Sequence, residues 1–184
     1  KTEQKNSLLS EARTGWVMRN GSSVNTSEGV EIQSLWSPVG KKYNFGINYT
    51  FTDSYDANTC DQDHLNAWSD NECRHTGNAV ATAKVRVPRH AMSAKFGYLI
   101  NPNFKTVFRG SYTGETRDFG NTNDNWTDQI LTDYFVFDVG GNYKLYNNYN
   151  LTFGLDNIFD EKYEQAHQYS TIGRTFNFGL KKIY

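Results

Sequence analysis

Two cysteines are the residues whose type and spacing point most directly to chemistry. Cys60 and Cys73 are the only cysteines among the 184 residues, and the segment DQDHLNAWSDNE separates them. In an oxidising compartment such a pair predicts a disulfide that closes a small loop, worth about 3 kcal/mol in the chain-entropy model. The alternative is a zinc site that adds His64 or His75, but no Cys-x-x-Cys pair supports it.

The same segment could hold a divalent cation, because hard cations such as Ca²⁺ take several carboxylate oxygens. Its acidic and imidazole side chains are Asp61, Asp63, His64, Asp70, Glu72 and His75. Their spacing matches no EF-hand, and charged external loops are common. We therefore expect a solvated loop and no resident metal.

Nucleophilic catalysis has a weak basis in the sequence. No Gly-x-Ser-x-Gly motif occurs, and the four histidines lie beside no recognised nucleophile motif. A hydrolase or acyltransferase would need a Ser and a His to meet in space, for instance Ser170 with His167. We expect the protein not to be an enzyme and to use no cofactor.

Composition narrows the class of protein. The 19 basic and 20 acidic side chains nearly cancel, so nucleic acid is not indicated as a partner. Aromatic residues make up 15% of the chain and only three residues are proline, which argues against long disorder. No run of about 18 apolar residues predicts a membrane helix, and the opening KTEQKNSLLSEARTG has no apolar signal-peptide core. A secreted β-sandwich and an outer-membrane β-barrel both fit.

Apolar and polar residues alternate with period two along most of the chain, which predicts strands with one apolar and one polar face. From 43 to 51 the odd positions are tyrosine, phenylalanine or isoleucine, and the even ones are asparagine, glycine or threonine. The pattern predicts seven strands, at about 30–36, 43–51, 92–100, 104–112, 135–145, 149–155 and 176–184. The first stretch extends back towards Trp16.

Three features favour the barrel. The expected connections alternate between short turns and long loops, as in outer-membrane barrels. Tyrosines collect near strand ends, as in interfacial girdles. Ionisable residues occupy mid-strand positions on the polar face, where a dry core would penalise them and a watery lumen would not. These residues are Lys95, Lys105, Arg109, Asp138 and Lys144.

The odd number of strands favours a fragment, because single-chain bacterial barrels have even strand numbers. The alternative divides the first stretch at residues 20–23. It gives eight strands and a self-contained small barrel.

The end of the chain resembles a known family. The segment NIFDEKY at 157–163, then Tyr169, GRTF at 173–176 and a final aromatic Tyr184, is similar to the carboxyl end of TonB-dependent outer-membrane receptors. Lys182 departs from this pattern, which more often has an aromatic residue there. Three upstream segments resemble the family in the same order, namely GVE at 29–31, VPRH at 87–90 and YTGETRD at 112–118.

The resemblance implies an all-β, antiparallel transmembrane barrel of 22 strands with an amino-terminal plug. Residues 1–184 would then be the carboxyl-terminal portion of the barrel domain, about seven strands, with the plug absent. The implied location is the bacterial outer membrane, with the carboxyl terminus on the periplasmic side.

The implied function is import of a scarce ligand with energy delivered by TonB. Cobalamin receptors are the most similar subfamily, and siderophore and haem receptors share much of the pattern. The implied partners are the plug and earlier strands, the TonB complex reached through the plug, a small-molecule or iron-chelate ligand, and outer-membrane lipid. The alternative function is that of a self-contained small barrel, such as a porin, an adhesin-like protein or an outer-membrane hydrolase.

A receptor would contact its ligand through apical loops and the upper lumen face. Trp68 and Trp126 are large aromatics within polar loops, Tyr134 begins a strand and Arg117 ends one. We expect these four residues to contact ligand; packing between loops or interfacial anchoring is the alternative for each.

The sequence also predicts roles for two further sets of residues. Basic residues on the inward faces would attract an anion or neutralise Asp138 and Glu115; they are Arg89, Lys95, Lys105 and Arg109. The apolar face of the last strand forms the pattern that the resemblance associates with the barrel-assembly machinery. It consists of Phe176, Phe178, Leu180 and Tyr184.

Overall fold

The computed structural model describes residues 2–5, 8–12, 16–20, 24–57, 81–122 and 125–182. Nearly all of them lie in strands, and a short 3₁₀ turn, η1, spans Tyr146–Asn148. The chain divides into two compact units, Lys1–Gly29 with Thr52–Val87 and Val30–Phe51 with Pro88–Tyr184. No helix in the described ranges is long and apolar enough to cross a membrane.

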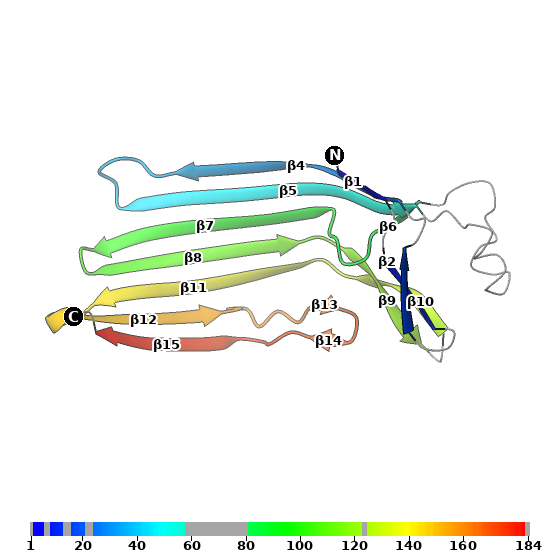
Figure 1. Cartoon of the computed structure of the whole chain (residues 1–184). Helices are drawn as coiled ribbons and strands as arrows, with labels where there is room; N and C mark the ends of the chain where they lie inside the picture. Colours follow the sequence, from blue (N-terminus) through cyan, green and yellow to red (C-terminus); the bar gives the residue numbers. More distant parts are fainter. Residues whose placement is uncertain are drawn as a thin grey trace. The chain divides into compact units, whose positions relative to one another are not determined.

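The second unit is a sheet in which strands that follow one another along the chain lie side by side (Figure 1). The hydrogen-bonded order is β4, β5, β7, β8, β11, β12, β15, and the pairs from β5 onward are antiparallel. These seven long strands confirm the sequence prediction. Their bounds are Val24–Trp36, Tyr43–Ala57, His90–Asn101, Phe104–Thr113, Tyr134–Lys144, Tyr149–Asp156 and Thr175–Lys182.

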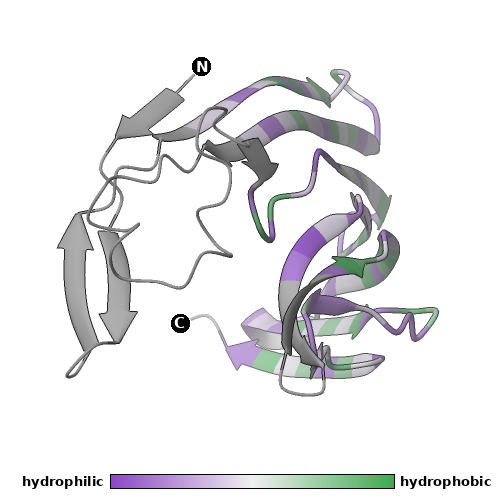
Figure 2. Cartoon of the chain, turned by 90° about the vertical axis from the view of Figure 1, so that its right-hand side faces the viewer, coloured by the Kyte–Doolittle hydropathy of each residue, from purple (hydrophilic) through white to green (hydrophobic). Residues whose placement is uncertain are grey.

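The pairing register unites the apolar faces of neighbouring strands, as the period-two pattern predicts. Colours for apolar and polar residues alternate along the strands of this unit in Figure 2. One row of direct partners crosses six strands through Phe45, Phe96, Phe108, Val139, Leu155 and Phe176. A one-residue slip at any pair would move a strand's whole apolar set to the other face.

These apolar side chains are exposed. Phe108 is 47% exposed and Phe176 68%, whereas Leu131 is the single buried hydrophobic residue in the described part of the chain. A soluble sandwich would bury such residues between two sheets, but a transmembrane barrel turns them towards lipid. The sandwich alternative is therefore excluded.

Two of the predicted long loops contain strands. Residues 119–129 lie mostly in a hairpin of β9 (Thr116–Thr122) and β10 (Asn125–Leu131). Within 160–172, β13 (Glu164–Ala166) pairs with β14 (Tyr169–Ser170). These two connections are long, as predicted, and each carries a short hairpin.

The first unit holds the start of β4, the end of β5 and four short strands. β1 (Thr2–Lys5) pairs with the start of β4, and β6 (Ala81–Ala83) with the end of β5. β2 (Leu8–Ala12) and β3 (Trp16–Asn20) pair with each other in a separate sheet. Among the described strands β3 pairs with β2 and not with β4, so β3 does not supply the eighth wall strand of the small-barrel alternative.

Candidate ligand-binding site

Charged side chains of adjacent strands lie in one row on the polar face of the second unit. Lys95 of β7 is the direct partner of Arg109 of β8, which is the partner of Asp138 of β11. Asp156 follows Leu155, the partner of Val139, so the same register places it opposite Asp138. The row therefore reads positive, positive, negative, negative, an arrangement that a water-filled lumen tolerates better than a dry core.

The expected basic cluster is only partly formed. Arg109 does lie beside Asp138, as expected for neutralisation. Lys105, however, lies four residues before Arg109 in β8 and is the partner of Asn142. Arg89 precedes β7 and Glu115 lies between β8 and β9, so neither belongs to this row.

From the acidic end of the row towards the long loops, the polar face has a hollow of about 530 Å³. Its lining includes Thr113, Tyr134, Asp138, Asp156 and Tyr163. Hydroxyl groups, carboxylates and two aromatic rings thus surround one volume. Such a lining offers hydrogen bonds and stacking surfaces to a polar ligand with flat groups.

The two tyrosines of the hollow form a stacked pair. Their ring centroids lie 4.0 Å apart with 24° between the planes. Tyr134 is fixed by pairing with Thr113 at the start of β11, and Tyr163 ends the NIFDEKY segment. Tyr134, one of the expected ligand contacts, therefore both packs on a neighbour and lines the hollow.

The floor of the hollow is set by Asn157. This residue is 4% exposed and has a φ of 52°, which asparagine adopts more readily than most residues. Its backbone N–H donates to Asp138 Oδ1 at 2.9 Å, while its side chain donates to Glu161 O at 3.0 Å and accepts from Glu161 N at 2.8 Å. The Asn157 side chain thus closes the turn after β12, and its backbone N–H holds the turn against β11.

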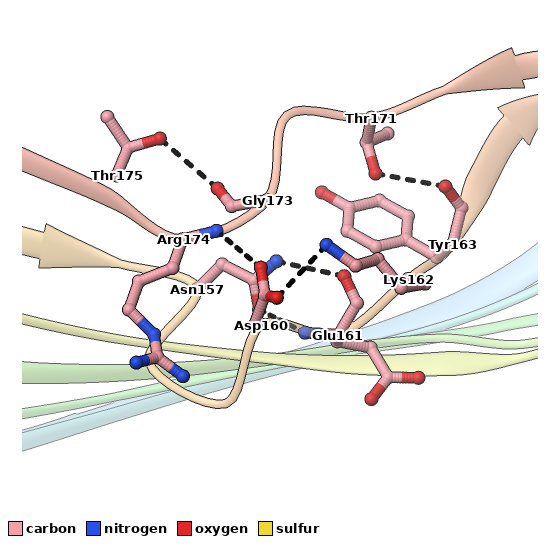
Figure 3. A network of polar contacts seen from close by, with 9 residues as sticks. All are labelled: Asn157, Asp160, Glu161, Lys162, Tyr163, Thr171, Gly173, Arg174 and Thr175. Atoms are coloured by element: carbon pink, nitrogen blue, oxygen red, sulfur yellow. Dashed lines mark hydrogen bonds and ion pairs between the residues drawn. The ribbon is translucent and has the colours of Figure 1, made fainter.

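Asp160 joins this turn to the start of β15 (Figure 3). Oδ1 accepts from the Arg174 backbone N–H at 2.8 Å, and Oδ2 lies 3.0 Å from Lys162 Nζ. The Arg174 N–H first and Lys162 second hold the pKa of the Asp160 carboxyl below its ordinary value. The residues that carry the family resemblance therefore brace the loop end of the last long hairpin.

A second hollow of about 440 Å³ lies between the end of β10 and the β13–β14 hairpin. Asp118 of β9, only 1% exposed, accepts a hydrogen bond from the His167 backbone N–H at 2.7 Å, which holds this hairpin in place. His167 and Ser170 both line the hollow, but no hydrogen bond in the described residues joins them. The His167 Nδ1 atom instead lies 3.8 Å from Glu164 Oε2, so the pair expected of a hydrolase is not assembled.

The structure describes the other expected ligand contacts only in part. Arg117 does not end a strand as expected; it lies within β9 as the partner of Ile130. Trp126 lies in β10 opposite Asn121, and the structure does not describe its side chain. Trp68, Cys60 and Cys73 lie outside the described residues, so the disulfide stays a prediction.

The predicted apolar face of the last strand is present as far as it is described. Phe176, Phe178 and Leu180 are 68%, 67% and 59% exposed and partner Leu155, Phe153 and Leu151. Tyr184 lies outside the described residues. The recognition of this face by assembly machinery stays a prediction.

Sequence reasoning missed three residues of this region. Tyr163 and Asp156 line the first hollow, and Asp118 anchors the hairpin beside the second. Tyr163 belongs to the NIFDEKY segment that the sequence analysis identified, but its stacking partner Tyr134 could not be recognised from the sequence. For metals, no group of three candidate ligands occurs in the described ranges, and the acidic segment from Asp61 to His75 lies outside them.

The exposed apolar face and the charged, hollowed opposite face define the wall of an outer-membrane β-barrel. The sequence profile described as "TonB dependent receptor-like, beta-barrel" matches residues 1–158, so the chain belongs to this family. The family consists of bacterial outer-membrane transport receptors and is not one of enzymes. No curated protein sequence matches the chain.

Solved receptor structures share the fold. The FrpB iron transporter from Neisseria meningitidis (F3-3 variant) has a TM-score of 0.70 and 17% identity, over 97% of this chain and 27% of that one. The pyoverdine receptor FpvA from Pseudomonas aeruginosa PAO1, bound to pyoverdine, gives 0.68 and 13%, over 99% and 26%. The ferric-catecholate import receptor Fiu from E. coli K12 gives 0.64 and 18%, over 96% and 23%. The chain thus spans about a quarter of the length of these proteins.

Proposed function

We propose that the chain is the carboxyl-terminal wall of a TonB-dependent receptor that imports an iron chelate across the outer membrane. In this proposal the plug and the earlier strands lie outside residues 1–184, the plug transmits TonB-delivered energy, and the carboxyl terminus faces the periplasm. The observation that carries the proposal is the hollow of about 530 Å³ on the polar face at the loop end, where a ligand entering from outside would arrive.

An iron chelate is the ligand class we propose in place of cobalamin. The structurally similar FrpB is described as an iron transporter, FpvA was solved with pyoverdine and Fiu imports ferric catecholate. The hollow itself supplies hydroxyl and carboxylate groups and the stacked Tyr134–Tyr163 pair. Flat chelating groups can stack on such rings and exchange hydrogen bonds with the polar lining.

Binding and uptake of labelled ligands test this proposal. Cells that carry the receptor should accumulate one or more ferric siderophores, and a proton uncoupler should abolish accumulation but leave surface binding. Uptake of labelled cobalamin but of no iron chelate would overturn the ligand class. Passive, uncoupler-insensitive entry of unrelated small solutes would instead indicate a porin.

The part played by the hollow is tested by Tyr134→Ala. Loss of one stacked ring should weaken binding of the ferric siderophore about tenfold, since an aromatic pair contributes about 0.5–1.5 kcal/mol beyond its buried area. Tyr98→Ala is the matched control. Tyr98 is the direct partner of Tyr43 and lies on the apolar face at the short-turn end. If both variants bound the ferric siderophore with equal affinity, Tyr134 would not belong to the binding site.

A further inference from the structure

Like charges face each other at both ends of the charged row on the polar face. Lys95 is the direct partner of Arg109, and Asp138 lies opposite Asp156. Like charges at directly opposite positions destabilise a sheet, and an alternating order of charges would avoid both pairs. The row therefore keeps its two signs apart although the separation destabilises the wall itself.

The basic half of the row, Lys95 and Arg109, has no partner of its own in the described part of the chain. Both side chains are exposed, and neither takes part in an ion pair or a hydrogen bond there. Arg109 lies beside Asp138 in the row, but no ion pair joins the two side chains. Two adjacent free cations on one surface attract an anion.

A third hollow, of about 360 Å³, adjoins this basic half. Its lining includes Lys95, Arg109, Gln33, Ser111 and Asp138. The two cations, an amide and a hydroxyl group thus border one volume and can all donate hydrogen bonds. Hydrogen bonds from cationic donors to an anionic group are the stronger kind.

The acidic half of the row, Asp138 and Asp156, lines the first hollow of about 530 Å³. Both residues are half-buried, and each accepts a hydrogen bond from a neutral donor, the Asn157 backbone N–H and the Asn177 side-chain amide respectively. No lysine or arginine among the described residues forms an ion pair with either carboxylate. The acidic half therefore suits a cationic group.

The first and third hollows adjoin each other along the polar face, because Ser111 and Asp138 line both. The strands that carry the row, β7, β8, β11 and β12, lie side by side (Figure 1). Neighbouring strands are about 4.8 Å apart, so the row spans roughly 14 Å. One ligand of the length of a linear chelator can reach both halves.

We propose that the polar face selects an iron chelate that carries an anionic group and a cationic group at opposite ends. Lys95 and Arg109 bind the anionic group, and Asp138 and Asp156 bind the cationic group. The bound charges offset the like-charge repulsion at both ends of the row, which gives the unfavourable order a function. This inference rests on the proposed function, because it specifies which iron chelate the receptor imports.

Four ferric trihydroxamate probes that differ only at their ends test the inference on the intact receptor. One end carries an ammonium or an acetamide group, the other end carries a carboxylate or a carboxamide, and the ferric core is uncharged in all four. In equilibrium binding to the purified receptor, the wild type should bind the probe with both charges most tightly. Replacing either charged group by its neutral counterpart should weaken binding about fivefold.

Neutral variants of the two halves should separate the two preferences. Lys95→Gln with Arg109→Gln should abolish the preference for carboxylate over carboxamide and keep that for ammonium over acetamide. Asp138→Asn with Asp156→Asn should do the reverse, and an asparagine oxygen can still accept the hydrogen bonds that these carboxylates receive. A purely structural role of these residues would not produce this crossed result.

Lys105→Gln with Lys144→Gln is the matched control for the basic half. Lys105 is the partner of Asn142, and Lys144 lies two residues further along β11 on the same polar face. Neither lysine lines the first or the third hollow. The control should keep both preferences of the wild type, and an equal loss of the carboxylate preference in the control and in the basic double variant would overturn the inference.

The outcomes also separate this inference from the proposed function. If the receptor imports an iron chelate but binds all four probes with equal affinity, or binds none of them, this inference alone is overturned. Uptake of cobalamin and of no iron chelate overturns the proposed function itself. A less stable basic double variant that keeps both preferences would assign the two cations to contact with the plug, which would also overturn the inference.

Discussion

At the scale of single residues, Asp160 ties together three parts of the chain's loop end. Its carboxylate accepts from the Arg174 backbone N–H and contacts Lys162, and the residue itself lies within the turn that Asn157 closes. Both Asn157 and Asp160 have positive φ, 52° and 56°, so the turn combines backbone conformations that few residues adopt readily. The motif is therefore informative because each position carries a backbone or hydrogen-bonding requirement.

Asp160→Asn should remove a pH-dependent part of the stability. The pKa of Asp160 is lowered in the folded state, so the charged form stabilises the fold above the unfolded pKa of about 4. This contribution disappears as pH falls through the folded pKa, because the wild type then becomes protonated. Thermal unfolding in detergent should show a less stable variant at pH 7 and no difference in strong acid. A constant difference across this range would contradict the role of the charge.

Gly173→Ala should disturb the same contact by shape. A Cβ at Gly173 would clash with Asp160 Oδ1 and would lie 3.0 Å from Lys162 Nζ. We expect a loss of about 0.5–1.5 kcal/mol in the free energy of unfolding, because these side-chain ends can move but the Asp160–Arg174 hydrogen bond is displaced. Gly154→Ala is the control, since its nearest neighbour would be Asn177 Cβ at 3.8 Å. If denaturant titration finds both variants equally stable, the close packing at Gly173 has no energetic weight.

At the scale of strands, adjacent residues of β15 lie on opposite faces of the wall, one towards the lipid and the next towards the lumen. Phe178 is 67% exposed on the apolar face, and Asn177 lies on the polar face within the first hollow. Phe178→Arg should cost about 2–4 kcal/mol near the bilayer midplane and impair assembly. Asn177→Arg should be tolerated, because Asn177 donates to Asp156 and an arginine there would meet a carboxylate. A membrane-insertion assay with equal yields would contradict the assigned faces.

The strands were predictable to the extent that lipid imposes a pattern on them. The seven long strands and the faces of their residues follow from period-two alternation, because a lipid-facing side chain must be apolar at every second position. The β9–β10 hairpin was not predictable in this way. Its segments TRDFGNT and NWTDQIL are largely polar and show no sustained alternation, as expected for strands beyond the hydrocarbon region.

The site was less predictable because its contacts join distant positions. Asp138 meets the Asn157 backbone 19 residues away, and Asp118 meets the His167 backbone 49 residues away. No local spacing encodes such contacts. Tyr134 was identified as a large aromatic at a strand start, while its partner Tyr163 is defined only by the folded loop.

At the scale of the whole molecule, the wall is open at β15, which has β12 as its neighbour and no strand on its other edge in the described sheet. Lipid cannot satisfy the backbone groups of an open edge. We therefore expect further strands to pair with this wall in the membrane.

The mass of the species in outer membranes tests this requirement. We expect denatured protein that contains this sequence to be several times larger than 21.1 kDa, and its folded form to migrate faster than the heated form on a gel. A heat-modifiable species of 21.1 kDa, stable alone, would support the self-contained small barrel.

The nearest-neighbour order of the strands also bears on how the wall folds. β7 and β8 are joined by a turn at Pro102 and Asn103, and β11 and β12 by the short η1 turn. Pairs this close in sequence form with little loss of loop entropy, so each hairpin can appear quickly and template the next. The slow step should then be the joining of edges that lie far apart along the chain, and a kinetic trap at that stage would expose the backbone of β15.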